Sequence, residues 1–247
     1  MTTGILFVFK LWKGRRKDKD CPTPPAEEKQ YLCEDYIKER ITDADFFKLV
    51  SLPPQLDYNE WLATHTMSFF NHVNLMYGVI SEYCTSENCP SMGAPGSVQY
   101  LWYDDKGKKY KYSAPQYIDY VMTSIQKTIT DETVFPTKFD HSFPSGFDNF
   151  VKKIHRYLLH VFAHIYHAHY RDMTMLGLHG HLNSVFTHFM VLNMRFDLLE
   201  DKDTEVLQDL VTALIKSLPD PNQNDQPTPD LGGDIEVIPS PLEITST

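Results

Sequence analysis

The longest helical pattern in the sequence begins at Asp57 and continues to about Cys84. Asp57 and Glu60 have the spacing of a capping box, which also places an acid in the first turn of a helix. Apolar and aromatic side chains then recur at intervals of three or four residues, at Leu62, His65, Phe69, Val73, Met76, Ile80 and Tyr83. This period predicts a long core helix. Glu60 and Trp61 lie beside the buried stripe, where one of them can be exposed.

A second helical pattern, Lys152–Arg171, holds five of the eleven histidines of the chain. Apolar residues separate them at helical intervals, so several imidazoles are expected to be buried. Ser145 and Asp148 predict the start of this helix, and Gly177 predicts its end or a bend. A buried imidazole without a partner is costly, so these rings need hydrogen bonds or a metal ion. The five are His155, His160, His164, His167 and His169.

The rest of the chain predicts further helices and a single β-hairpin, so the expected fold is a mostly helical bundle. Ser113 and Gln116 form a second capping-box pattern, with Pro115 in the first turn. The predicted elements are a partly irregular Tyr31–Leu52, a hairpin of Gln99–Tyr103 with Lys108–Tyr112, and helices at Ser113–Thr130, His181–Phe196 and Asp203–Leu218.

Composition divides the chain into three parts. Residues 1–30 are basic and contain several prolines, and we expect a flexible arm there. Residues 31–218 hold the helical patterns and form one domain. Residues 219–247 are acidic and proline-rich, which predicts disorder. Residues 1–20 carry a net charge of +4 and residues 219–247 a net charge of −6; subtracting both from the total of −10 leaves −8 between them.

These totals limit the class of protein. A chain of 247 residues with 42% hydrophobic side chains can bury one sizeable core. The apolar run Gly4–Phe9 is too short to span a bilayer, and the basic residues that follow it are misplaced for a signal peptide. We therefore expect a soluble, intracellular protein with no transmembrane segment. An acidic folded part argues against nucleic acid and suits a basic protein partner.

Two cysteines, Cys84 and Cys89, have a spacing that metal sites use, and four cysteines are too few for a disulfide framework. Zn²⁺ favours four nitrogen and sulfur ligands in a tetrahedron, so two imidazoles of the histidine helix could complete a structural site. Spacing alone does not choose them. The candidates are the pairs His160/His164, His164/His167 and His164/His169, with His179 and His181 also available.

Several enzyme classes are excluded by missing motifs. The sequence contains no His-Glu-x-x-His and no Glu-x-x-His, which removes the common zinc-protease and di-iron arrangements. It also lacks a Walker A loop, a Gly-x-Gly-x-x-Gly turn and a Gly-x-Ser-x-Gly elbow. The remaining enzymatic alternative is a zinc-dependent hydrolase in which one metal position is open to water.

Five motifs, in order along the chain, resemble those of the Mob (phocein-like) kinase co-activators. They are LPPQLDYNEWLATHTMSFFNHVNLMYG, CTSENCP, SAPQYIDYVM, DETVFPTKF, and AHIYHAHY followed by HLN. The resemblance covers about residues 31–218 and is strongest to the type-two branch. It implies an all-α fold with a four-helix core, and a structural Zn²⁺ held by Cys-x4-Cys and two histidines. Carried over, the ligands are Cys84, Cys89, His164 and His169.

The resemblance also implies a partner. It makes the chain a non-catalytic regulator that binds the basic N-terminal regulatory segment of NDR-type Ser/Thr kinases and modulates their autophosphorylation and activity. Glu60 and Trp61 occupy matching positions on the long helix, and His188 matches a histidine on a neighbouring helix. Core packing of Trp61 and helix capping by Glu60 are the alternatives for these two residues. Cytoplasm and nucleus, with a perinuclear pool, are the implied locations.

Two departures from the family pattern narrow these expectations. Members that bind phosphothreonine peptides of upstream kinases carry three basic residues where this chain has Arg156, Tyr157 and His160. A phosphate needs several charged donors, so we expect weak or absent binding of such peptides. Members that act with LATS kinases carry an acid where this chain has Ser68, which favours NDR-type kinases over LATS.

Overall fold

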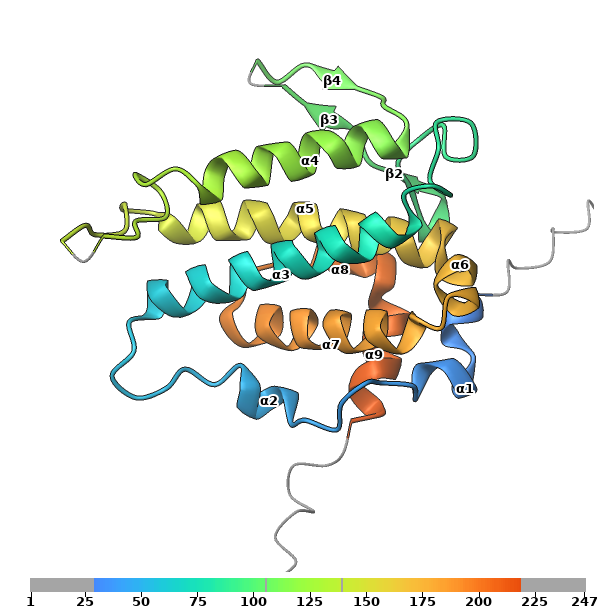
Figure 1. Cartoon of the computed structure of the whole chain (residues 1–247), viewed down its shortest axis with the longest axis horizontal. Coiled ribbons are helices and arrows are strands. Elements are labelled where there is room, and N and C mark those ends of the chain that lie inside the picture. The colour runs from blue at the N-terminus through green and yellow to red at the C-terminus, as the bar shows by residue number, and fades with distance from the viewer. Residues whose placement is uncertain (1–28, 105, 139, 219–247) are drawn as a thin grey trace, which may run out of the picture.

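The computed structural model describes residues 29–104, 106–138 and 140–218 (Figure 1). The predicted flexible arm, apart from its last two residues, and the predicted disordered tail lie outside these ranges. Within them, α5 packs against α3 and α4, while α3 also contacts α4 and α7. The four-helix core consists of α3 (Tyr58–Ile80), α4 (Ala114–Ile129), α5 (Phe147–Ala168) and α7 (His179–Phe196).

Capping hydrogen bonds explain where two of these helices begin, and a glycine in the left-handed conformation marks the start of a third. The Asp57 carboxylate accepts hydrogen bonds from the backbone N–H groups of Asn59 and Glu60, at 2.8 and 3.1 Å, so the predicted cap of α3 is confirmed. A capping box at Ser113 starts α4 as expected. For α5 the expected start at Ser145 is wrong, because Gly146 is the N-cap with a φ of +77°, a conformation that favours glycine.

The histidine helix is shorter than predicted. α5 ends at Ala168, and His169 leaves the helical conformation with a φ of −127° and a ψ of 11°. A separate helix, α6 (Tyr170–Met175), precedes Gly177. The reason is geometric: five residues along a continuous helix rotate a side chain by about 140°. The break at His169 lets its ring turn toward the same point as that of His164.

The last predicted helix, Asp203–Leu218, is divided into three short segments. This change of direction lets α8 contact α5 while α9 packs against α7 and the N-terminal segment. The predicted amphipathic pattern was correct, but its continuity was not. The segments are α8 (Asp201–Thr204), the 3₁₀-helix η3 (Glu205–Leu207) and α9 (Gln208–Lys216).

The structure contains more strand than the expected single hairpin, so the fold is mostly helical and not strictly all-α. The predicted hairpin is present in shortened form as β3 (Trp102–Tyr103) and β4 (Lys109–Tyr110). A second antiparallel pair, which the sequence analysis missed, joins β1 (Gly93–Ala94) to β2 (Val98–Gln99). The chain reverses between them through the 3₁₀-helix η2 (Pro95–Ser97).

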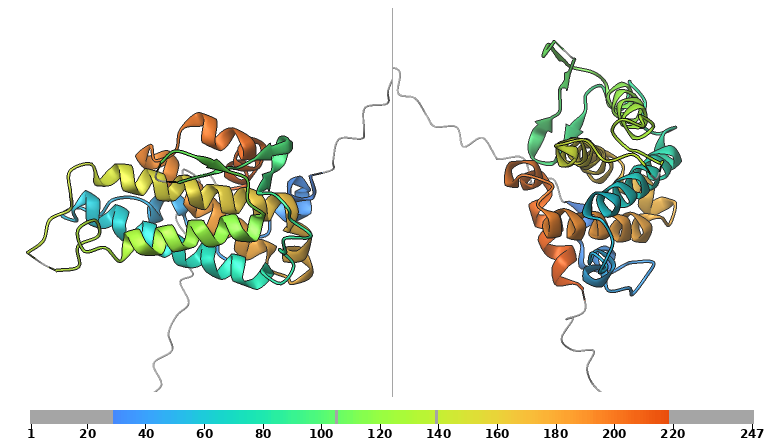
Figure 2. Two further views of the ribbon diagram at one scale, coloured as in Figure 1. Left: turned by 90° about the horizontal axis from the view of Figure 1, so that it is seen from above. Right: turned by 90° about the vertical axis from the view of Figure 1, so that its left-hand side faces the viewer.

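The N-terminal segment runs along the side of α7 that faces away from α3 (Figures 1 and 2). It is mixed, as predicted, and α2 packs directly on α7. Asn183 on α7 fixes the segment by donating hydrogen bonds to the carbonyls of Tyr36 and Glu39. Its elements are the 3₁₀-helix η1 (Gln30–Leu32), α1 (Glu34–Ile37) and α2 (Phe46–Leu49).

Aromatic rings fill the interior where α3, α5 and α7 meet. The ring centroid of Phe162 lies 5.1 Å from those of both Phe186 and Phe189, and Phe69 lies 5.3 Å from Phe189. All four are buried. None of the helices among the described residues is both long enough and apolar enough to cross a membrane.

Candidate metal centre and docking face

Two thiols and two imidazoles meet where α3 and α5 end. Cys84 follows α3 and Cys89 lies in the turn beyond it, while His164 is near the end of α5 and His169 directly follows that helix. Their four ligand atoms lie within 4.8 Å of one another, and all four residues are buried. The structure therefore brings together the four residues that the family resemblance implied.

The distances and ring orientations fit a tetrahedral zinc site. The Nε2 atom of His164 lies 3.5 Å from the Cys84 sulfur, and the Nε2 atom of His169 lies 3.4 Å from the Cys89 sulfur. Zinc bonds of about 2.3 Å to sulfur and 2.0–2.1 Å to nitrogen, at tetrahedral angles, place these atoms about 3.5 Å apart. Both imidazoles thus direct Nε2 toward the centre of the cluster.

The outer nitrogens of both rings are held by fixed partners. Nδ1 of His164 lies 2.9 Å from the Gly93 carbonyl oxygen, and Nδ1 of His169 lies 2.9 Å from the Asp172 carboxylate. An N–H group at each Nδ1 donates to these oxygens and leaves Nε2 as the lone-pair atom. Such partners are typical of histidines that bind metals. Neither Gly93 nor Asp172 belongs to a ligand motif, so the sequence alone does not reveal their role.

Burial sets the protonation of the cluster. It raises the pKa of Cys84 to about 12, with the nearby Cys89 sulfur acting in the same direction. It lowers the pKa of His164 to about 4. The imidazole is therefore neutral at pH 7 and able to bind a metal, whereas the thiols need a nearby cation to become thiolates. This donor set fits Zn²⁺.

The other candidate histidines lie apart from the cluster. His160 stacks on Tyr100 with ring centroids 3.7 Å apart, and its Nδ1 accepts a hydrogen bond of 2.7 Å from the Tyr117 hydroxyl. His167 is exposed, and His179 faces Glu39 with their nearest side-chain atoms 2.5 Å apart. Neither these three nor His181 joins the group that can hold a metal. The pairs His160/His164 and His164/His167 are therefore not the ligand pair.

A closed set of four ligands has a structural consequence. An ion bound by all four residues would link the turn after α3 to the end of α5, about 80 positions apart in sequence. Zinc would supply a fixed cross-link there, with no ligand position left for water or substrate. The carboxylate of Asp172, beside the cluster, is hydrogen-bonded to His169 and is therefore engaged as a partner of a ligand. The geometry therefore does not favour the hydrolase alternative.

The three predicted partner-binding residues lie at the opposite end of α3. Glu60 is exposed in its first turn, and Trp61 is partly buried with its indole N–H donating to the Val50 carbonyl at 3.3 Å. His65 connects Trp61 to His188, with ring centroids 4.2 Å from the former and 5.7 Å from the latter. The structure thus places His65 between Trp61 and His188, whose ring also lies 4.9 Å from that of Phe69 farther along α3, while Glu60 precedes Trp61 in the first turn.

His188 has an unusual environment. Its Nε2 atom is buried and has no hydrogen-bond partner among the described residues. Burial lowers its pKa to about 4, so the ring is neutral at pH 7, and the positive fields that His65 and His72 would exert act in the same direction. A buried nitrogen without a partner carries a free-energy cost that a bound ligand can remove.

Exposed apolar side chains lie on α2, in the segment that joins α2 to α3, and at the start of α3. They give no periodic signal in the sequence, because α2 has only four residues and Leu52 and Leu56 lie outside any helix. We call the surface formed by Glu60, Trp61, His188 and these side chains the docking face. Its apolar members and their exposed fractions are Phe47 (41%), Leu49 (45%), Leu52 (36%), Leu56 (42%) and Tyr58 (39%).

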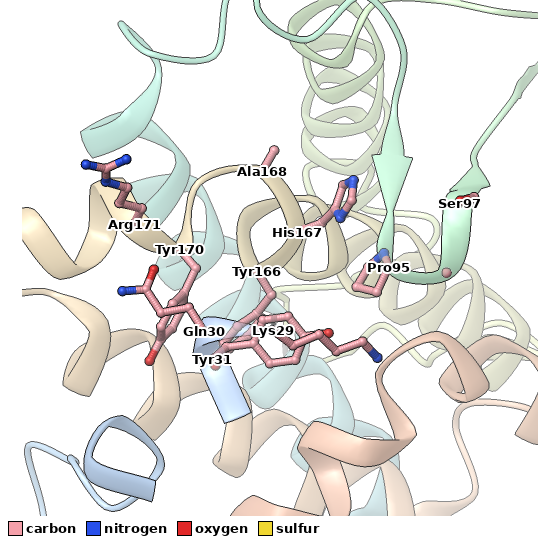
Figure 3. A pocket seen from close by; sticks show the side chains of 11 residues that line it. Lys29, Gln30, Tyr31, Pro95, Ser97, Tyr166, His167, Ala168, Tyr170 and Arg171 are labelled. Atoms are coloured by element: carbon pink, nitrogen blue, oxygen red, sulfur yellow. The ribbon is translucent and has the colours of Figure 1, made fainter. Parts of the chain in front are cut away.

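A cavity of about 400 Å³ is lined by residues that flank His169 in sequence, from Tyr166 to Arg171, together with residues of η1 and η2 (Figure 3). Tyr31 from η1 and Tyr166 and Tyr170 from α5 and α6 contribute its aromatic side chains, with Pro95 from η2 on another side. The three tyrosines pack on one another, with ring centroids 5.7 to 6.1 Å apart. This contact ties the N-terminal segment to the helix break that positions His169.

The three positions that the family resemblance assigns to phosphothreonine binding are paired with carboxylates or uncharged. Arg156 donates to the carboxylates of Asp203 and Glu200, at 2.9 and 3.2 Å. Burial lowers the pKa of His160 to about 3, so its ring carries no charge at pH 7. Tyr157 supplies no charge.

Comparison with known proteins agrees with this geometry. A mostly helical fold that carries a buried Cys₂His₂ cluster defines the class, and residues 38–207 match the Mob1/phocein family. The chain is 52% identical to "MOB kinase activator 2" of Mus musculus over 206 residues, which cover 83% of this chain and 87% of the mouse protein. The human protein of the same name is 50% identical over 203 residues, covering 81% and 85%.

The chain belongs to the Mob1/phocein family. Its relatives are named as kinase activators, hence as regulators of catalysis by other proteins. "MOB kinase activator-like 2" of Drosophila melanogaster is 51% identical over 202 residues, 82% of this chain. The aligned part spans only 36% of that fly protein, and 37% of its Drosophila pseudoobscura counterpart.

Proposed function

We propose that this protein is a non-catalytic kinase regulator whose docking face binds the basic N-terminal regulatory segment of an NDR-type Ser/Thr kinase. Binding would order that segment and modulate autophosphorylation and activity, because a ligand shifts a conformational equilibrium by its differential affinity for the two states. The observation that carries the proposal is the docking face itself: Glu60 is exposed beside apolar side chains and the unpartnered His188.

The chemistry of the face matches an amphipathic basic helix. Exposed apolar residues on α2 and at the start of α3 can receive the apolar stripe of such a helix. Glu60 and the exposed Asp43 and Asp45 supply negative charge for its lysines and arginines. The backbone near the start of α3 is already fixed by the Asp57 cap. A preformed face reduces the ordering cost of binding.

Zinc in the Cys₂His₂ cluster would have a supporting role. Cys84, Cys89, His164 and His169 would hold it, and the ion would fix the ends of α3 and α5 relative to each other. Since α3 also carries Glu60 and Trp61, the cross-link would stabilise the helix that presents the docking face.

Two features support the choice of kinase and the lack of a second ligand. Ser68 is exposed and has no charge to offer where LATS-binding members carry an acid. Arg156, the one firm cation of the phosphothreonine site, is held by two carboxylates. We therefore propose NDR-type kinases as partners and little phosphate-dependent peptide binding.

Cytoplasm and nucleus are the cellular locations that we propose. Imaging of the tagged full chain tests this proposal.

The direct test is calorimetric titration of the full chain with a synthetic basic helical segment that precedes an NDR-type kinase domain. We expect saturable binding with a Kd that rises as salt increases from 50 to 500 mM, because salt screens exposed charge pairs. A peptide of equal charge with its apolar stripe replaced by serine is the matched control and should bind weakly. Equal binding of both peptides, or none, contradicts the proposal.

A further inference from the structure

Five aromatic rings form a continuous stack on the side of the molecule that carries the β3–β4 hairpin. Neighbouring rings are nearly parallel, with centroids 5.7, 4.9, 5.6 and 5.6 Å apart along the series. They come from β4, the segment after it, α4, β3 and α5. We call the series the aromatic row; in order it is Tyr110, Tyr112, Tyr120, Trp102 and Tyr157.

The row is accessible to a ligand. Tyr120 is 44% exposed, and the other four rings are partly buried. Tyr103, beside Trp102 on β3, is 50% exposed. The hairpin lies on the side of α4 remote from α2 (Figures 1 and 2), so the row is separate from the docking face. Neither the metal cluster nor the kinase proposal uses these residues.

Lysines border the row although the folded part of the chain is acidic. The ammonium groups of Lys108, Lys109 and Lys153 lie 4.9, 5.6 and 6.0 Å from the ring centroids of Tyr110, Tyr103 and Tyr157. The described carboxylates form no ion pair with these lysines, since all ion pairs there involve other groups. Lys106 and Lys111 are exposed nearby.

This combination of groups selects one class of ligand. Tyrosine and tryptophan rings line the surfaces to which proline-rich segments bind. Such segments already favour the polyproline II conformation, so they lose little conformational entropy on binding. Lysines that form no ion pair with the described carboxylates attract the carboxylates of a ligand. The fitting ligand is therefore an extended peptide that is both proline-rich and acidic.

We propose that the aromatic row and its lysines are the docking surface for residues 219–247 of the same chain. That segment has six prolines, six acidic residues and no basic residue. The basic segment near the start of the chain also precedes several prolines, but its charge opposes binding beside lysines. Proline rings would pack against the exposed faces and edges of the aromatic rings, and the acidic side chains would face Lys108, Lys109 and Lys153.

Chain length permits this contact within one molecule. The described part ends at residue 218, and 29 residues in a polyproline II conformation reach about 90 Å. A domain of this size is only about 40 Å across. The link to the domain also gives the segment an effective concentration in the millimolar range, which allows a weak contact to be well populated.

The test follows the indole N–H signal of Trp102 by NMR in the full chain, with Trp102→Phe as the assignment control. A tail variant carries Asp220→Asn, Asp225→Asn, Asp230→Asn and Asp234→Asn. We expect the Trp102 signal to move in this variant toward the position that the unmodified chain reaches in 1 M salt. The matched control changes four exposed acids elsewhere, Glu34, Asp35, Glu82 and Glu87, to their amides and should leave the signal in place.

A second measurement adds a synthetic peptide of residues 219–247 to the tail variant. Recovery of the original signal supports the proposal, and Lys108→Glu with Lys109→Glu should weaken this recovery roughly tenfold. An indole signal that is the same in all chains and salts overturns the proposal. A signal that depends on protein concentration between 10 and 500 µM overturns docking within one molecule.

Discussion

The two ends of α3 differ in how completely their polar groups are satisfied. At its C-terminal end, Cys84 and the other three members of the cluster are buried, and both imidazoles have partners at each nitrogen. At its N-terminal end Glu60 is exposed, and the Nε2 atom of His188, which packs against the first half of α3, has no hydrogen-bond partner in the described part of the chain. With 23 residues, the helix separates these ends by about 34 Å.

Under the proposed function, the closed end is structural and the open end binds the partner. A cluster with four protein ligands leaves no position open for another ligand, so it contributes to folding stability. An open face with exposed apolar groups has a free-energy cost in isolation that a partner can reduce. In this proposal, one helix links a metal-held anchor to a surface that a partner completes.

The largest expected effect comes from breaking the anchor. His169→Ala should remove stoichiometric zinc and lower the Tm by about 10 °C or more. Loss of a structural metal costs several kcal/mol of folding free energy, and each kcal/mol shifts the Tm by roughly 2–4 °C. Elemental analysis and calorimetry measure this. His167→Ala, at an exposed position two residues away, is the control. A wild-type protein that is fully folded without metal would show that the cluster is not an anchor.

A buried histidine, His155, hydrogen-bonds to Thr66 and Asn193 in the core between the two ends of α3. It should make the folding stability depend on pH. Burial lowers the pKa of His155 to about 4, while its Asn193 hydrogen bond acts in the opposite direction. The unfolded chain takes up this proton near pH 6.5 and the folded one only near pH 4. The contribution is complete above pH 6.5 and falls by on the order of 3 kcal/mol as pH decreases to 4.

Urea unfolding at pH 7.5 to 4.5 measures this slope. His155→Gln keeps a polar side chain between Thr66 and Asn193 but does not titrate, so its stability should decrease less at low pH. The exposed His167→Gln serves as the matched control. Parallel curves for all three proteins would place the titrating groups elsewhere.

A smaller change should weaken the anchor without removing it. Asp172→Ala deprives the His169 ring of its carboxylate partner at 2.9 Å. Loss of such a partner typically lowers metal affinity by about 10- to 100-fold. Competition with a chromophoric chelator measures the affinity, and Asp119→Ala on the exposed side of α4 is the control. Unchanged zinc affinity would mean that the ring is positioned by packing alone.

At the open end, Glu60→Lys should weaken binding of the basic kinase segment by about fivefold, the effect of one or two exposed charge contacts. Calorimetry at 100 mM salt measures the Kd. Glu82→Lys, an exposed reversal beyond the other end of α3, should leave it within twofold and separates local contact from net charge. Equal losses in both variants would leave only a general electrostatic effect.

The smallest effect is expected from phosphate. Phosphorylated and unphosphorylated versions of an upstream-kinase threonine peptide should bind within about twofold of each other, since Arg156 is held by Asp203 and Glu200 and His160 is neutral. If phosphorylation increased the affinity for the peptide tenfold or more, the molecule would have a second binding surface. The contrast between the two ends of α3 would then be weaker.

Periodicity and capping in the sequence determined the long helices. The 3.6-residue pattern located α3, α4, α5 and α7, and local hydrogen bonds at Asp57 and Ser113 explain two of their starts. These signals depend on neighbouring residues, so they can be read without a structure. Family motifs added the identities of the four cluster residues, which spacing had left open.

Only the tertiary structure decided how distant residues meet. The break at His169, the Gly93 carbonyl and the Asp172 carboxylate depend on where α3 ends relative to α5. The same holds for the pairing of Arg156 with Asp203 and for the five-ring row built from separate elements. Such contacts arise from packing between segments far apart in sequence, and no local pattern records them.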